Sequence, residues 1–187
     1  MGRLGAMLDE KRLIWRLQRG SVDALRLIYD KYKLDLLKLA ILLTGDIHRS
    51  EDAVQDVFLR LAESYDRISE HGNLKNFLIT CLMNRLRTLR RDSQRHQAAQ
   101  LDDTVIEAAR VSAPDQWAVV NEQMQRIAKA MAELPLEQRE VVTLRFEGGM
   151  GFRQIAKIQN ASINTVQGRY RYGMEKLRAL LNSEVET

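Results

Sequence analysis

Residues 152–169 read FRQIAKIQNASINTVQGR, and this stretch decides the fold of the C-terminal half of the chain. A short helical pattern over 152–159 is followed by a longer one that starts at Ile163. Between them, Asn160 can take the left-handed conformation that ends a helix, and Ser162 can cap the next helix. Small apolar residues allow two helices to cross closely. This stretch offers four such residues, Ile155, Ala156, Ile163 and Val166. The stretch predicts a helix-turn-helix.

The second helix of this motif carries side chains suited to DNA. In a helix-turn-helix, the N-terminal residues of the second helix face base edges in the major groove. Residues 153–178 hold Glu175 as their one acid, against the basic residues Arg153, Lys157, Arg169, Arg171, Lys176 and Arg178. Such a local excess of positive charge is typical of a DNA-binding face. The predicted DNA contacts are Arg153, Asn164, Thr165, Gln167, Gly168, Arg169, Arg171 and Tyr172.

Upstream of the motif, more helices are expected. Pro135 is placed to open a helix that runs through Arg145. Apolar residues at steps of three and four predict another helix before it, and they are Trp117, Val120, Met124, Ile127 and Met131. The glycines of 148–151 lack the lysine and hydroxyl of a phosphate-binding loop, so we expect them to end one helix and start another.

The N-terminal half predicts three helices. The first runs from Val22 to Leu43, and the second begins after Ser50, which is expected to be its cap, with acids in its first turn. The third starts at Leu74 and ends in a basic cluster. From 93 to 116 the periodicity fades into a polar composition, which predicts a flexible linker.

Opposite charges lie on neighbouring segments of this half. Acids dominate residues 46–70: Asp46, Glu51, Asp52, Asp56, Glu63, Asp66 and Glu70 stand against Arg49, Arg60 and Arg67. Between 75 and 95 the balance reverses, with Asp92 against Lys75, Arg85, Arg87, Arg90, Arg91 and Arg95. The distribution of charge is therefore more informative than the mild net charge of +4.

The composition favours an all-α protein of two small helical domains. The chain has 187 residues with only 10 Gly and 2 Pro, and 45% of its residues are hydrophobic. One cysteine, Cys81, excludes an internal disulfide, and the longest apolar run, 39–43, is too short to span a membrane, so we expect a cytoplasmic protein without membrane insertion. The isolated His48, His71 and His96 predict no metal site, and we expect no cofactor and no enzymatic activity.

Two blocks of the chain, roughly 21–92 and 117–181, resemble the extracytoplasmic-function sigma factors of the sigma-70 family. In the first block, residues 51–61 (EDAVQDVFLRL) look like the family's helix that docks on the clamp coiled coil of the polymerase beta-prime subunit. The resemblance implies that the contact is made by Asp52, Gln55, Asp56 and Phe58. Acids and an amide around an apolar anchor fit such a contact.

Residues 74–85 (LKNFLITCLMNR) resemble the family's segment that engages and melts the −10 promoter element. Phe77 stands where the family usually has Trp. The resemblance implies that the preceding loop, 66–73, holds an extruded base. It also implies that the duplex is contacted by Lys75, Asn84, Arg85, Arg87, Arg90 and Arg91.

In the second block, residues 134–146 (LPLEQREVVTLRF) are similar to the opening of the family's domain that reads the −35 element. The helix-turn-helix follows, with departures: Gln167 replaces the usual Lys or Arg, Gly168 the usual Ser, and Arg153-Gln154 a commonly acidic pair. The promoter sequence therefore does not carry over. Gly168 costs helix stability, up to about 1 kcal/mol relative to Ala, and gives the backbone room to approach DNA.

The resemblance implies a sigma factor that binds core RNA polymerase, through the beta-prime clamp coiled coil and the beta flap, and promoter DNA; it leaves an anti-sigma factor open. The predicted parts are an N-terminal extension (1–20), a region 2-like domain (21–92), a linker (93–116) and a region 4-like domain (117–187). Two alternatives stay open at this point: a stand-alone helix-turn-helix regulator that binds operators, and a helical adaptor whose basic faces never meet DNA.

Overall fold

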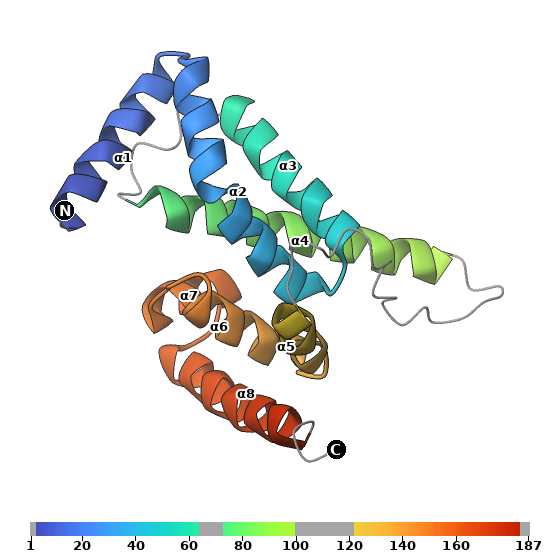
Figure 1. Cartoon of the computed structure of the whole chain (residues 1–187). Coiled ribbons are helices and arrows are strands. Elements are labelled where there is room, and N and C mark those ends of the chain that lie inside the picture. Colours follow the sequence, from blue (N-terminus) through green and yellow to red (C-terminus); the bar gives the residue numbers. More distant parts are fainter. Residues whose placement is uncertain (1–2, 64–72, 100–121, 184–187) are drawn as a thin grey trace. The chain divides into compact units, whose positions relative to one another are not determined.

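A computed structural model describes residues 3–63, 73–99 and 122–183 of the chain (Figure 1). The described part is entirely helical, which confirms the predicted fold class. Its contacts divide it into two compact units, one formed by residues 3–37, 52–63 and 73–99 and the other by 38–51 and 122–183. No helix within these ranges combines the length and the apolar character needed to cross a bilayer.

The first unit is built from α1 (Arg3–Gln18), α2 (Val22–Thr44, up to residue 37), α3 (Ile47–Glu63, from residue 52) and α4 (Leu74–Ala99). The periodic apolar residues of the sequence form its core: Ile28 and Leu36 of α2, Val57 and Leu61 of α3, and Leu78 and Leu82 of α4 are all buried. The helix predicted from Val22 is confirmed. The third predicted helix is also confirmed, but it continues to Ala99. The linker predicted for 93–116 is therefore wrong over residues 93–99, and its remaining residues lie outside the described part of the chain.

α1 lies within residues 1–20, which the sequence predicts only as an N-terminal extension, and it is a helix. It turns into α2 at Gly20, whose φ of 77° lies in the left-handed region. Glu10 attaches it to α2, because its carboxylate accepts a hydrogen bond from the hydroxyl of Tyr32 and pairs with Lys31 at 3.3 Å. Burial and the bond to Glu10 raise the pKa of Tyr32, so this hydroxyl stays a donor.

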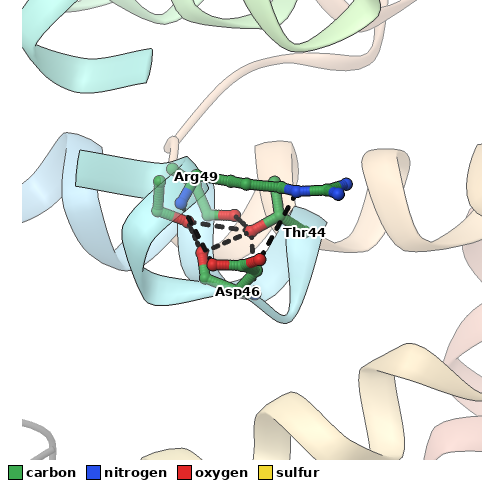
Figure 2. A network of polar contacts seen from close by, with 5 residues as sticks. Thr44, Asp46 and Arg49 are labelled. Carbon is green, nitrogen blue, oxygen red and sulfur yellow. Dashed lines mark hydrogen bonds and ion pairs between the residues drawn. The ribbon is translucent and has the colours of Figure 1, made fainter. Parts of the chain in front are cut away.

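At the turn between α2 and α3, the structure differs from the predicted start of the second helix (Figure 2). α3 begins at Ile47, so Ser50 lies inside the helix and is not its cap. The carboxylate of Asp46 accepts a hydrogen bond from the backbone N–H of Arg49 at 3.0 Å and pairs with its guanidinium at 3.4 Å. Ser50 is buried, and its hydroxyl lies 2.8 Å from that of Thr44. An acid that caps the positive end of a helix starts α3 one turn earlier than expected.

The second unit holds α5 (Glu122–Ala132), α6 (Leu136–Phe146), α7 (Phe152–Gln159) and α8 (Ile163–Ser183). α5, α6 and α7 all contact α8, and their shared core contains Met131, Leu134, Val142 and Leu177. Pro135 precedes α6 as predicted. The predicted use of the glycines is also confirmed, since Gly149 has a φ of 65° after α6 and Gly151 is the N-cap of α7.

Candidate nucleic-acid and protein interfaces

The helix-turn-helix has the predicted local geometry. Asn160 ends α7 in the left-handed conformation, with φ 49° and ψ 49°. Ser162 caps α8, because its hydroxyl oxygen accepts a hydrogen bond from the backbone N–H of Thr165 at 3.0 Å. Of the residues expected at the helix crossing, Ile155, Ala156 and Val166 are buried, whereas Ile163 is partly exposed at the start of α8.

We expect Asn160→Ala to lower the free energy of unfolding by about 1 kcal/mol, because a Cβ without a compensating polar group disfavours the left-handed conformation. Asn160→Gly is the matched variant and should retain or slightly raise stability, since glycine adopts this conformation without strain. Urea denaturation followed by circular dichroism measures both. Equal destabilisation by the two substitutions would mean that the asparagine side chain, and not the backbone conformation, is what matters.

Three of the eight predicted DNA-contacting residues, Asn164, Gln167 and Arg171, share one exposed side of α8, here called the reading face. Asn164, Gln167 and Arg171 lie three or four residues apart along α8, so they project from the same side of the helix. They are exposed, as are Thr165 and Tyr172 on α8 and Arg153 on α7. The guanidinium of Arg171 lies 5.0 Å from the ring centre of Tyr172. Amide, guanidinium and phenol groups therefore reach solvent together beside the N-terminal half of α8.

Gly168 and Gly173 of α8 differ in their surroundings. A Cβ at Gly168 would meet nothing within 4 Å, so no internal contact requires a glycine there. A Cβ at Gly173 would lie 3.0 Å from a methyl group of Val142 and 3.3 Å from the Cβ of Gln138. Gly173 is thus needed for close packing of α6 on α8, and Gly168 is not.

Arg169 departs from the other predicted readers. It is partly buried, and its guanidinium donates a hydrogen bond to the side-chain oxygen of Gln159 at 2.8 Å. The amide nitrogen of Gln159 donates to the carboxylate of Glu140 and to the carbonyl of Glu137, both at 2.9 Å. Sequence reasoning missed Gln159, because no local pattern links residues on three different helices.

On α3, the exposed members of the predicted docking set are Asp52 and Gln55. Phe58 is 6% exposed and packs edge-on against Tyr29, with 4.8 Å between ring centres. It therefore supports the helix from inside and offers no surface to a partner. The next residue, Leu59, is 60% exposed and lies on the side of Asp52 and Gln55. Asp52, Gln55 and Leu59 form the surface that we call the docking face.

On α4, the predicted cations fall into two groups. Lys75 pairs with Asp35 of α2 at 2.8 Å, and Arg85 pairs with Asp56 of α3 at 2.5 Å. Asn84, Arg90 and Arg91 are exposed along the later turns, and Arg87 is partly buried. The predicted base-holding loop lies mostly outside the described residues, apart from Asn73, whose side chain caps α4. The exposed cations thus gather toward the C-terminal half of α4.

The described residues contain no group of His, Cys, Asp and Glu that could hold a metal ion. Cys81 is partly buried on α4, and its burial raises the pKa of its thiol above the ordinary value. A thiol held in its neutral form is a poor nucleophile.

Both halves of the chain match known protein families. The family models described as "Sigma-70 region 2" and "Sigma-70, region 4" match residues 28–96 and 124–177. The ECF RNA polymerase sigma factor SigL of Mycobacterium tuberculosis is 30% identical over 161 residues, which cover 84% of this chain and 88% of the relative. This chain belongs to the extracytoplasmic-function (ECF) sigma factors.

Other proteins that resemble this ECF sigma factor are sigma factors as well. The ECF RNA polymerase sigma factor EcfG of Rhodopseudomonas palustris is 30% identical over 146 residues, 78% of each chain. The sigma factor RpoE of Bartonella quintana, solved in complex with the anti-sigma factor NepR, has 25% identity and a TM-score of 0.65, covering 83% of this chain and 96% of that one. Membership of the family makes the protein a promoter-recognition factor, and a stand-alone regulator is not favoured. The region 2 match contains the docking face and all but the last three residues of α4, and the region 4 match contains the reading face.

Proposed function

We propose that this ECF sigma factor binds core RNA polymerase through the docking face of α3 and directs it to promoters through α4 and the reading face of α8. In this proposal α4 contacts the −10 element with Asn84, Arg90 and Arg91, and α8 contacts the −35 element. The observation that carries it is the reading face itself: side chains predicted to read DNA project together into solvent from one side of α8.

The mechanism is recognition by two tethered sites. Each DNA-binding site alone binds weakly, and both gain when the polymerase holds them at a fixed spacing on one duplex. In this proposal the polymerase and −10 functions belong to a part that starts at residue 21 and ends beyond the predicted residue 92, because α4 continues to Ala99. The −35 function keeps its predicted range, 117–187. The factor acts in the cytoplasm without catalysis of its own, and its partners include the beta-prime clamp coiled coil, the beta flap and an anti-sigma factor.

The cations of α4 have different roles in this proposal. Lys75 and Arg85 are already neutralised by Asp35 and Asp56, so in the free protein they mainly hold α4 against α2 and α3. Arg90 and Arg91 are exposed and can approach phosphates directly. Contact with the −10 duplex therefore depends mostly on the C-terminal half of α4.

Reconstitution with bacterial core RNA polymerase tests the proposal. The purified protein is expected to co-elute with core polymerase in gel filtration and to start transcription from a subset of a promoter library. A stand-alone regulator would instead bind its duplex target unaided and leave core polymerase inactive. An adaptor would show no binding to random duplex in fluorescence anisotropy even at low salt.

The exposed leucine of the docking face yields a separate prediction. We expect Leu59→Ser to weaken binding to core polymerase about tenfold, because an apolar side chain at the centre of an interface contributes most when water is excluded around it. Leu34→Ser on α2 is the matched control, since Leu34 is 54% exposed and lies outside the docking face. Binding is measured by anisotropy of labelled protein against core polymerase. Equal losses for the two variants would argue against a specific role of Leu59.

A further inference from the structure

The last residue of α7, Gln159, connects α7 to both α6 and α8. Its amide nitrogen donates to Glu140 and to the carbonyl of Glu137 on α6, while its amide oxygen accepts from Arg169 on α8. Gln159 is itself partly buried, and Glu140 is 6% exposed. A side chain with both a donor and an acceptor is required at this place, because its neighbours are a carboxylate and a guanidinium.

The contact with Arg169 lies on the inner side of α8. Arg169 is two residues from both Gln167 and Arg171, so it projects from roughly the opposite side of the helix. A hydrogen bond there resists rotation of α8 about its own axis. The rotation of α8 decides which side chains the reading face presents, and base readout needs that orientation to be accurate.

We propose that Gln159 is the positioning residue that sets the rotation of α8, so that discrimination between −35 sequences depends on a side chain that does not touch DNA. The inference rests on the proposed function of the reading face. The same bond keeps the guanidinium of Arg169 turned inward. When the bond is lost, Arg169 is free to reach phosphates, which adds binding without sequence preference.

Swapping the amide of Gln159 and the carboxylate of Glu140 distinguishes a positioning role of Gln159 from a merely structural one. Gln159→Glu places a second carboxylate beside Glu140, and like charges at hydrogen-bond distance repel. Adding Glu140→Gln restores a donor facing an acceptor: the new amide donates to the new carboxylate, which also accepts from Arg169. The bond to the Glu137 carbonyl stays lost, because a carboxylate cannot donate. The double variant E140Q/Q159E should therefore recover most, but not all, of what Q159E loses.

The experiment uses the full chain assembled with core RNA polymerase and a duplex library whose −35 hexamer is randomised. Selectivity is the ratio of enriched to average sequences recovered in open complexes. We expect Q159E to lower this ratio about tenfold, the size of a single well-made base contact. The double variant should return to within about threefold of wild type, and Gln125→Glu, the same charge change on α5, should leave the ratio unchanged.

Gln159→Leu is a second variant that adds no charge, and it should keep the protein folded while lowering selectivity and raising binding to random duplex. Thermal melting of each variant confirms that the protein is folded. A double variant no more selective than Q159E, or a Gln159→Leu variant with the wild-type profile, would overturn the inference. A wild-type holoenzyme that enriches no sequence would overturn the proposed function and the inference with it.

Discussion

Asp52→Arg is expected to weaken the association with core RNA polymerase by about 30- to 100-fold. Asp52 is exposed on the docking face, on the same side of α3 as Gln55 and Leu59. In the proposed function its charge faces the polymerase. Reversal of that charge replaces an attraction with a repulsion, which costs several kcal/mol where the groups are desolvated. The stability of the free protein should change little, because substitutions at exposed positions away from caps and ion pairs have small effects.

The control for this experiment is Asp30→Arg, an equal change of charge at an exposed position on α2 outside the docking face. Asp56 is unsuitable for the test, because its pairing with Arg85 means that a substitution would also disturb α4. Binding is measured by titration of labelled protein with core polymerase at two salt concentrations. If Asp52→Arg and Asp30→Arg lose affinity equally, net charge rather than the docking face governs the association.

A second large effect is expected from the two glycines of α8. Gly173→Val should lower the free energy of unfolding by about 2–3 kcal/mol, because its methyl groups would overlap Val142 in a packed core. Gly168→Ala should instead raise the free energy of unfolding by up to about 1 kcal/mol, since alanine favours the helix and meets open space. Gly168→Val controls for branching at Cβ and should be close to neutral. Urea denaturation measures all three.

Transcription by the Gly168→Ala variant is expected to fall, although the stability of the protein rises. If the bare backbone there lies against DNA, the added methyl group of Gly168→Ala holds α8 away from the groove. We expect −35-dependent transcription to fall about tenfold in a protein that is more stable than wild type. A more stable variant with full activity would show that the glycine is not used for approach to DNA.

Local patterns predicted much of this protein. The helix-turn-helix follows from neighbours in sequence: Asn160 ends one helix through its own backbone conformation, and Ser162 caps the next through a hydroxyl three residues from its donor. The periodic apolar residues of α2 and α4 likewise select one face of each helix, and those faces are buried. These features need no knowledge of distant residues, so the sequence is enough.

Other features depend on which helices meet. Phe58 and Leu59 are adjacent and both apolar, and only the packing of α3 on α2 decides that the first is buried against Tyr29 while the second faces solvent. In the same way, the pairing of Asp56 with Arg85 joins positions on two helices, and the bonds of Gln159 join three. The sequence by itself determined where helices lie, which residues cap the helix-turn-helix and which segments carry each charge, because these are set by near neighbours. The tertiary structure alone decided which of those charges are free and which apolar residue is exposed, because both depend on the relative rotation of packed helices.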